Sequence, residues 1–424
     1  MPQDRTEKYL EVSVSSIGAR GDGIAESPMG RLYISYAATG DRLRVRVGGP
    51  RGDGRTARIE TILDPSPDRT EPACRHFGTC GGCSVQHLAD TAIARLKQNL
   101  ITTALKRKAL PEDTVTDTVT APPGSRRRVS LAFHRGGATV LGFNERASRR
   151  ILNIRHCPVM RPALMHLLSP LRGLCAELDA LGRSADLHLT ETASGIDLLI
   201  LPARPADPGL KGRETLAAFA EAHDLCRISW GTGTEIEPIV QRREAVMRFA
   251  GAAVALPPGA FLQASAAGET AIQEAAIAAI GKSGAARIAD LYAGCGTLSF
   301  PLAKLAPVHA VEGDESLAAA LTRAAQGHPV TVERRDLQRD PMTPAALNEF
   351  DAVLFDPPRA GAKPTADALA LSRVTLVVAV SCNPATLARD LRILVDGGYR
   401  LDSVTPIDQF TWSAHVEAVA VLRR

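Results

Sequence analysis

The feature that most constrains the fold is the regular alternation of apolar runs with helix-compatible segments over residues 257–424. Seven strand-like runs occur there, and the most apolar of them lies between Val374 and Ser381. Runs that are apolar on both faces and separated by helices are typical of a parallel sheet covered by helices on its two sides. We therefore expect a doubly wound α/β fold with a mostly parallel seven-stranded sheet.

Cys382 follows the most apolar run directly, in the sequence Ser-Cys-Asn-Pro. The carboxyl ends of parallel strands face the ligand crevice of an open α/β sheet, so a thiol at this position is placed for chemistry. A free cysteine is more often a small buried hydrophobe, and packing is therefore the alternative role. The run by itself leaves both roles open.

A glycine turn after the first of the seven runs predicts a cofactor site. Gly294 and Gly296 allow the backbone to approach a ligand at the start of a helix. The third glycine position of the dinucleotide motif holds Ser299, whereas Glu312 and Asp336 end the next two runs. Acids and glycines without a pyrophosphate fingerprint favour S-adenosylmethionine over NAD, with Glu312 at the ribose and Asp336 at the adenine amino group.

Two further motifs lie at predicted strand ends. Asp356 and Arg359 belong to the sequence DPPR, whose prolines fix a rigid turn after the fourth run. The turn would hold Asp356 beside a sulfonium and direct Arg359 toward the substrate, although a plain strand-ending turn is the alternative. Glu417 opens the last run within HVE, near the same rim as Cys382.

Three closely spaced cysteines, Cys74, Cys80 and Cys83, predict a metal or cluster site. Eight cysteines in so long a chain do not resemble a disulfide framework. Cys157 is the best candidate for a fourth ligand because a proline follows it, as is common at cluster ligands. Four thiolates bind either zinc or a [4Fe-4S] cluster, and the spacing leaves both open.

The first 256 residues divide into two predicted domains. Residues 1–66 contain short alternating runs broken by glycines, which indicate a small OB-like β-barrel of the kind that binds single-stranded nucleic acid. Residues 67–256 mix strand-like and helical segments and carry clustered arginines, including Arg127, Arg128 and Arg146. Such clusters suit phosphate, and a solvated face is the alternative.

No apolar run approaches the roughly 18 residues of a membrane-spanning helix, and the start, Met-Pro-Gln-Asp-Arg, lacks the apolar core of a signal peptide. We therefore expect a cytoplasmic protein. The net charge of +4 is mild, so any preference for nucleic acid must come from local patches.

The motifs SCNPATLARD, DPPR, ADLYAGCGT, FLQAS and HVE, together with the cysteine array, resemble the RNA uracil-5-methyltransferase family. The closest likeness is to the members that modify 23S rRNA and carry an N-terminal TRAM domain and a [4Fe-4S] cluster. The resemblance implies a Rossmann-like class I methyltransferase domain over residues 257–424, a TRAM barrel over residues 1–66, and a monomer that acts on RNA. It implies S-adenosylmethionine as cofactor, Cys382 as nucleophile at uracil C6, and Glu417 as the base that removes the C5 proton.

The remaining roles implied by the resemblance fall on two sets of residues. The cofactor and active-site contacts are Gln263, Tyr292, Gly294, Gly296, Thr297, Glu312, Asp336 and Asp356. The cluster ligands are Cys74, Cys80, Cys83 and Cys157.

The sequence departs from the family pattern at two places. Ser265 stands where the family usually has Asn, and QFTWSAHVE replaces MFPxTxHVE, which leaves Trp412 either stacking a base or packing. The alternatives are the relative that methylates uridine-54 of tRNA, which normally lacks the barrel and the cysteine array, and a catalytically silent RNA-binding factor. A cytosine-5 methyltransferase would need a Pro-Cys motif where this chain has DPPR.

Overall fold

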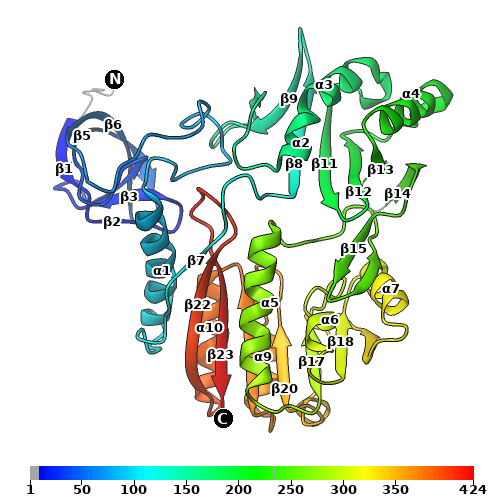
Figure 1. The fold of residues 1–424 in the computed structure, drawn as a ribbon. Helices are drawn as coiled ribbons and strands as arrows, with labels where there is room; N and C mark the ends of the chain where they lie inside the picture. The colour runs from blue at the N-terminus through cyan, green and yellow to red at the C-terminus, as the bar shows by residue number, and fades with distance from the viewer. Residues whose placement is uncertain (1–8, 233–234) are drawn as a thin grey trace.

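The computed structural model describes residues 9–232 and 235–424. Figure 1 shows three groups of strands, with a barrel at the upper left, a central sheet at the upper right and a larger sheet below. Residues 1–8, on which the expected lack of a leader peptide rests, lie outside the described part of the chain. Within the described ranges, no helix is both long and apolar enough to cross a bilayer.

The N-terminal sheet has six strands in the order β1-β5-β6-β4-β3-β2. Strands β1 to β6 span Tyr9–Ser13, Ser16–Ile17, Asp22–Ala25, Arg31–Ser35, Arg42–Arg51 and Gly54–Asp64. The end strands β1 and β2 are almost continuous, and the Ser15 N–H donates to the Ile24 carbonyl at 2.8 Å. The sheet therefore curls until its two ends meet, and the expected N-terminal β-barrel is confirmed.

The central sheet has seven strands in the order β10-β9-β8-β11-β12-β13-β14, and only β12 and β13 pair in parallel. Strands β8 to β14 span Arg128–Arg135, Thr139–Asn144, Ile151–Asn153, Ser184–Thr192, Gly195–Pro202, Leu225–Thr232 and Glu235–Gln241. Helices α2 (Pro162–His166), α3 (Leu168–Glu177) and α4 (Gly209–Ala222) and the short 3₁₀ turn η1 (Asp179–Leu181) accompany them. The expected mixed α+β middle of the chain is confirmed.

The C-terminal sheet has eight strands in the order β19-β18-β17-β20-β21-β23-β22-β7. Strands β17 to β23 span Ile288–Leu291, Val308–Glu312, Val330–Arg334, Ala352–Phe355, Leu376–Ser381, Arg400–Asp408 and Glu417–Arg423. Helices α5 to α10 span Ala266–Gly281, Ser299–Leu302, Glu315–Ala324, Pro344–Leu347, Lys363–Ala370 and Pro384–Asp396. The hairpin β15 (Val246–Phe249) and β16 (Ala252–Ala255) packs into the same core.

Seven of these eight strands are the expected ones, and the doubly wound α/β fold is confirmed. Strand β7 (Val119–Thr120) comes from the segment before the central sheet and pairs in parallel with β22. The Thr116 N–H also donates to the Val404 carbonyl at 3.0 Å, so this segment runs alongside strand β22 for several residues. Helix α1 (Asp90–Lys106) packs beside it and buries Ile101 and Leu105 in the C-terminal core.

Strand direction determines where the chemistry can be located. Strands β17 to β21 run parallel, and β23 runs antiparallel to β21 and β22. The strand order reverses between β18 and β20 on either side of β17, which is the switch point where open α/β sheets bind ligands. The residues that follow β17, β18, β20 and β21 therefore collect at one edge, together with the first residue of β23.

Candidate active site

The three predicted catalytic residues meet at this sheet edge. Asp356 follows β20, Cys382 follows β21, and Glu417 is the first residue of β23. Because Ser381 lies opposite Ala418 in the antiparallel register, Cys382 and Glu417 are the next neighbours beyond that pair. An antiparallel last strand thus brings its starting residue to the edge where the parallel strands end.

A chain of buried side-chain amides joins the two carboxyl groups. Gln263 Nε2 donates to Asp356 Oδ2 at 3.0 Å, and Gln263 Oε1 accepts from Gln409 Nε2 at 2.7 Å. Gln409 Nε2 also donates to Glu417 Oε2 at 2.9 Å. Sequence analysis did not single out Gln409, since a glutamine in an irregular segment carries no pattern of its own.

Glu417 is buried and Asp356 is half-buried, and this loss of solvent disfavours the charged form of each carboxyl group. Burial raises the pKa of Asp356 to about 7, although the hydrogen bond from Gln263 opposes the shift. Burial and the charge of Asp356 raise the pKa of Glu417 well above its usual value. Glu417 Oε1 is buried without a hydrogen-bond partner among the described residues. Glu417 Oε1 is therefore free to accept a proton.

The Cys382 thiol is half-buried, and burial with the charges of Glu417 and Asp356 raises its pKa to about 11, against a lowering effect of Arg359. It lines a groove of about 880 Å³ between the barrel, helix α1 and the turn after β21. Arg359 lines the same groove, and its backbone carbonyl accepts from Asn383 Nδ2 at 3.0 Å. The DPPR turn and the Cys382 turn are thereby tied together.

The glycine turn after β17 has the features of a ligand cradle. Gly294 has a φ of +58°, and a Cβ added there would meet no atom within 4 Å, so the space beside it is open. Glu312 Oε2 accepts from the Gly294 N–H at 2.7 Å, which places a carboxylate beside this space. Gly296 serves packing instead, because a Cβ there would lie 2.6 Å from Leu321.

The remaining expected cofactor residues surround this turn. The Tyr292 hydroxyl lies 3.2 Å from Thr365 Oγ1, and burial raises the pKa of Tyr292. The Thr297 carbonyl accepts from Gln273 Nε2 at 2.9 Å at the start of the next helix. Asp336 follows β19, and its carboxylate accepts from the Gln338 N–H at 3.0 Å.

The four predicted ligand cysteines line one cavity of about 320 Å³. They come from loops, namely the segment before α1 and the segment after β10. Burial raises the pKa of Cys83 to about 12 and also raises the pKa of Cys80 and Cys157. These thiols are half-buried. Thiols become thiolates when a bound cation compensates their charge, so this donor set fits a metal or cluster.

The spacing of these thiols bears on what the cavity could hold. Within residues 9–232 and 235–424, no three His, Cys, Asp or Glu side chains are close enough together to hold a single metal ion. A zinc ion would draw each sulfur to about 2.3 Å, whereas a cluster places each thiolate on a different iron. The four cysteines that line the cavity are donors that either occupant would use.

The arginines singled out from the sequence occupy different environments. Arg127 is buried, donates to the Gln263 carbonyl at 3.1 Å and pairs with Glu269, so it supports the active-site segment from inside. The Arg128 guanidinium lies over the Phe261 ring at 5.1 Å. Arg127 thus offers its charge to the protein interior and not to an RNA phosphate.

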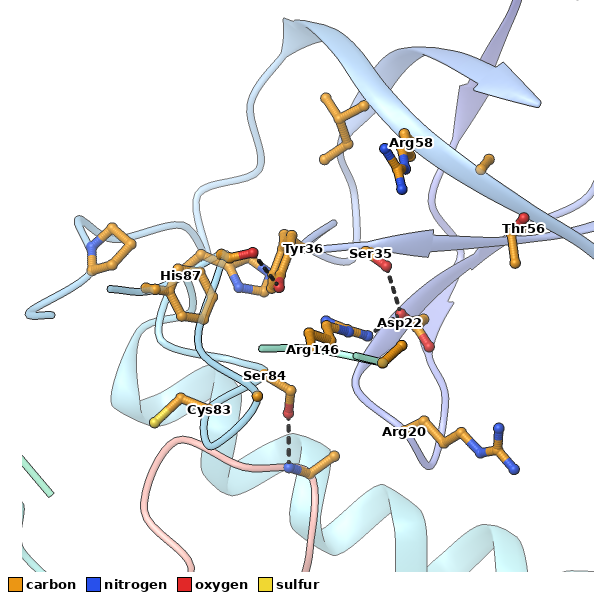
Figure 2. A pocket seen from close by; sticks show the side chains of 18 of the residues that line it. Arg20, Asp22, Ser35, Tyr36, Thr56, Arg58, Cys83, Ser84, His87 and Arg146 are labelled. Carbon is orange, nitrogen blue, oxygen red and sulfur yellow. Dashed lines mark hydrogen bonds and ion pairs between the residues drawn. The ribbon is translucent and has the colours of Figure 1, made fainter. Parts of the chain in front are cut away.

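Arg146 lies at the junction between the central sheet and the barrel. Its guanidinium donates to Asp22 Oδ1 at 2.6 Å and lies over the Tyr36 ring at 4.8 Å. Figure 2 shows this group beside Ser35 in a cavity of about 1960 Å³ that the cysteine loop also lines. Arg146 therefore joins the two domains at the wall of a large open cavity.

The cysteine loop is also bonded to the segment that leads into Glu417. The N–H groups of Ser84 and Val85 donate to the Trp412 carbonyl at 2.9 and 3.1 Å. The Ala414 N–H donates to Ser84 Oγ at 3.2 Å, one of the hydrogen bonds drawn in Figure 2. The residues immediately after Cys83 thus hold the loop that precedes β23.

A buried lysine completes this attachment. Lys97 of α1 is fully buried, and its Nζ donates to the Ser413 carbonyl at 2.6 Å and to the His415 carbonyl. The same Nζ pairs with Asp408 Oδ1 at 3.0 Å. Helix α1 therefore fixes both ends of the loop between β22 and β23.

Comparison with known proteins agrees with this geometry. The model of the tRNA (uracil-5-)-methyltransferase family matches residues 252–424. An uncharacterized RNA methyltransferase of Mesorhizobium japonicum is 43% identical over 97% of both chains. The 23S rRNA (uracil(1939)-C(5))-methyltransferase RlmD of Chromohalobacter salexigens is 32% identical over 97% of this chain and 89% of its own length.

The chain belongs to the RNA uracil-5-methyltransferase family. The solved tRNA (uracil-54, C5)-methyltransferase of Pyrococcus abyssi, in complex with S-adenosyl-L-homocysteine, has the same fold with a TM-score of 0.75. That match covers 97% of this chain and 99% of the archaeal chain at 21% identity. The fold and the family expected from the sequence are therefore confirmed.

Two departures from the family pattern now have a structural explanation. Ser265 caps helix α5, where its Oγ accepts from the Gly268 N–H at 3.1 Å, a role that Asn fills equally well. Trp412 packs against the apolar cluster formed by Val85, Leu88 and α1. The structure thus gives Trp412 the packing role, one of the two that the sequence left open.

Proposed function

We propose that this protein methylates C5 of one particular uridine in RNA, and that this RNA is 23S rRNA. The reaction would proceed through a covalent bond between Cys382 and uracil C6. The observation that carries the proposal is the convergence of Cys382, Asp356 and Glu417 at one sheet edge, beside a glycine turn, with the Cys382 side chain lining an open groove. A silent RNA-binding factor would have no need to keep a thiol and two carboxyl groups together.

The first step is nucleophilic addition by Cys382. Its thiolate sulfur bonds to C6, and the C5=C6 electron pair shifts toward C5 and the O4 carbonyl, which makes C5 a carbon nucleophile. Asp356 is the nearby acceptor for the thiol proton, since its charge raises the pKa of Cys382, and Glu417 thereby stays free for the later C5 proton. Thiolate formation and carboxyl protonation are thereby linked.

The cofactor residues fit S-adenosylmethionine, which supplies an electrophilic methyl group when it is bound. The open space at Gly294 with Glu312 beside it suits the nucleoside, and Asp336 lies at the next strand end for the adenine amino group. Asp356 would lie near the cationic centre, where a positive charge lowers the carboxyl pKa from about 7. The remaining residues of the proposed cofactor site are Gln263, Tyr292 and Thr297.

Glu417 then completes the reaction as the base. Its free Oε1 takes the C5 proton, the C5–H electrons form the C5=C6 double bond, and the C6–S bond breaks with its electron pair returning to Cys382. The uracil must leave its stack to reach these groups. The groove that Cys382 lines has a volume of about 880 Å³, which leaves room for an extruded nucleotide.

The proposed division of labour follows the three predicted domains. Residues 257–424 perform the chemistry, residues 1–66 form a TRAM barrel, and residues 67–256 carry a [4Fe-4S] cluster on Cys74, Cys80, Cys83 and Cys157 and help to position RNA. Zinc is the second candidate for the cysteine cavity. One chain holds every proposed catalytic residue, so we propose that the enzyme acts as a monomer. We also propose that it is cytoplasmic.

The preference for 23S rRNA over tRNA rests on two observations. The relative that is 32% identical over nearly the full chain is named for 23S rRNA, whereas the tRNA enzyme resembles this chain at 21% identity. The chain also has both the barrel and the cysteine array. The tRNA uridine-54 activity is the second candidate.

Two measurements test the proposal. RNA that carries 5-fluorouridine at the target should form a denaturation-resistant adduct, because the C5 fluorine cannot leave as a proton. Mapping of 5-methyluridine by mass spectrometry in ribosomal and transfer RNA, from cells with and without the gene, identifies the target. Absence of the adduct with active enzyme would exclude the covalent route, and loss of the modification from tRNA alone would exclude the ribosomal assignment.

A further inference from the structure

We propose that Gln409 is a positioning residue that fixes the hydrogen-bond directions of Gln263 and Glu417 and leaves one oxygen of Glu417 open to the C5 proton. The inference rests on the proposed function and concerns a residue that the family pattern does not predict. QFTWSAHVE has glutamine where the family usually has methionine, so the arrangement is a property of this chain.

The backbone determines which way the Gln409 amide points. Gln409 follows β22 and is 3% exposed. Its Oε1 accepts from the Ala264 N–H at 3.0 Å. A flipped amide would bring two donors together and leave the buried Ala264 N–H unpaired, which costs the desolvation of that group. The amide nitrogen is therefore held on the side away from Ala264.

That nitrogen has two acceptors, one on each side. It donates to Gln263 Oε1 at 2.7 Å and to Glu417 Oε2 at 2.9 Å, so both hydrogens of the amide are used. Gln263 must in turn direct its own nitrogen to Asp356, at 3.0 Å from Oδ2. One backbone N–H thus orients two amides and makes each a donor to a different carboxyl group.

The consequence for Glu417 is a division between its two oxygens. Oε2 receives the hydrogen bond from Gln409, and a donor to a carboxylate favours the charged form of that group. Oε1 has no hydrogen-bond partner in the described part of the chain. Gln409 therefore stabilises the carboxylate at one oxygen while the other is left to remove a proton.

Helix α5 holds Gln409 in this place. A Cβ added to Gly268, in the first turn of α5, would lie 2.4 Å from Gln409 Cβ. The Ser265 cap and the missing side chain at Gly268 together make room for the glutamine at the helix N-terminus. The amide is therefore confined by packing as well as by hydrogen bonds.

The charged groups around Glu417 come from every neighbouring element. Asp356 follows β20 and Cys382 follows β21, and each has an unfavourable charge interaction with Glu417. On β22, Asp408 is paired with Lys97 of α1. On α5, Glu269 is paired with Arg127. Gln409 is the hydrogen-bond donor to Glu417 in this set, so its loss should raise the pKa of the carboxyl group.

The test is the pH dependence of adduct resolution in Gln409→Met. In a single turnover, the methylated adduct contains no free Cys382 thiol, so its decay reports the base and not the nucleophile. A hydrogen bond to a charged group changes that group's ionisation constant by about tenfold or more. The acid limb, which is the fall in the rate of adduct resolution at low pH, should therefore move up by about one pH unit. Turnover at high pH should stay within a few-fold of wild type.

Gln98→Met is the matched control, because Gln98 of α1 donates to the Thr116 carbonyl away from the active site. It should leave the acid limb in place. Gln409→Glu is a second, nearly isosteric variant, and its adduct resolution should slow further as pH rises and the new carboxyl group ionises.

An unchanged acid limb in Gln409→Met, or an equal loss of rate at every pH, would overturn the assignment. Failure of the proposed function looks different, because wild-type enzyme would then form no adduct with 5-fluorouridine RNA. If Gln409→Met does not fold, adduct resolution in Gln409→Glu that is independent of pH would overturn the assignment in the same way.

Discussion

The active edge and the cysteine cavity hold reactive groups by different means. Asp356, Cys382 and Glu417 lie at strand ends, where the register of a buried sheet fixes their positions. The four cysteines lie on loops, and burial without a cation raises the pKa of Cys80, Cys83 and Cys157. A sheet edge is organised by the fold itself, whereas a loop cavity lined by half-buried thiols depends on what it binds.

The largest expected effect is at the sheet edge. Cys382→Ala should lower methylation by more than about 10⁴-fold, as the loss of a covalent nucleophile does in other enzymes. The strands should remain intact, so the thermal unfolding midpoint should stay near that of wild type. Cys175→Ala, at a buried thiol of α3, is the control and should keep its activity. Undiminished turnover in Cys382→Ala would remove the nucleophile assignment.

Glu417→Gln should slow product release by about 10²- to 10⁴-fold, the range that a general base contributes. The addition of Cys382 and the methyl transfer come earlier, so a methylated protein–RNA adduct should accumulate on denaturing gels. Glu349→Gln removes a surface carboxylate that pairs with Arg287 and should behave as wild type. Release of free product at the normal rate would exclude Glu417 as the base.

Cys157→Ala tests the proposed cluster in the cysteine cavity. We expect loss of bound iron, loss of absorbance near about 400 nm, and a lower unfolding temperature. Activity should fall by about 10- to 100-fold, because Ser84 and Val85 connect the cysteine loop to the segment before Glu417. Cys226→Ala, at a buried thiol of the central domain, should retain its metal. An anaerobic preparation that contains only zinc would favour zinc over the cluster.

The smallest effect concerns the groove that leads to the active edge. Arg359→Ala should raise KM for RNA by about tenfold and reduce the slope of log affinity against log salt by about 1, and it should lower kcat modestly because Arg359 also lowers the pKa of the Cys382 thiol. Arg323→Ala, in the last turn of α7, serves as the control. An unchanged salt slope would show that Arg359 does not contact a phosphate.

The parts of the fold that could be predicted are those that repeat. Strands β17, β20 and β21 are buried along their whole length and are nearly continuous apolar runs, so they were the clearest strands of the C-terminal sheet in the sequence. Strand β7 was not predicted, because Val119 and Thr120 are two exposed residues whose strand conformation comes from pairing with β22. A tertiary contact of that kind leaves no local pattern.

The candidate site divides in the same way. Asp356, Cys382 and Glu417 could be placed because each follows or begins a recognisable strand. Gln409 could not, since its role exists only after β22 and α5 have come together. Arg127 and Arg128 were both predicted to suit phosphate, but neighbouring residues in an extended segment point to opposite sides, and Arg127 points inward.

The hydrogen bonds between Ser84 and the loop before Glu417 also determine when the active edge can form during synthesis of the chain. Ala414 and Ser84 are 330 positions apart, and Lys97 and Ser413 are 316 apart. Synthesis completes the partners in the first hundred residues long before the loop that they hold has left the ribosome. Contacts so distant in sequence are slow to close. The active edge can therefore be assembled only on a finished chain, and a nascent or prematurely ended one carries no working methyltransferase.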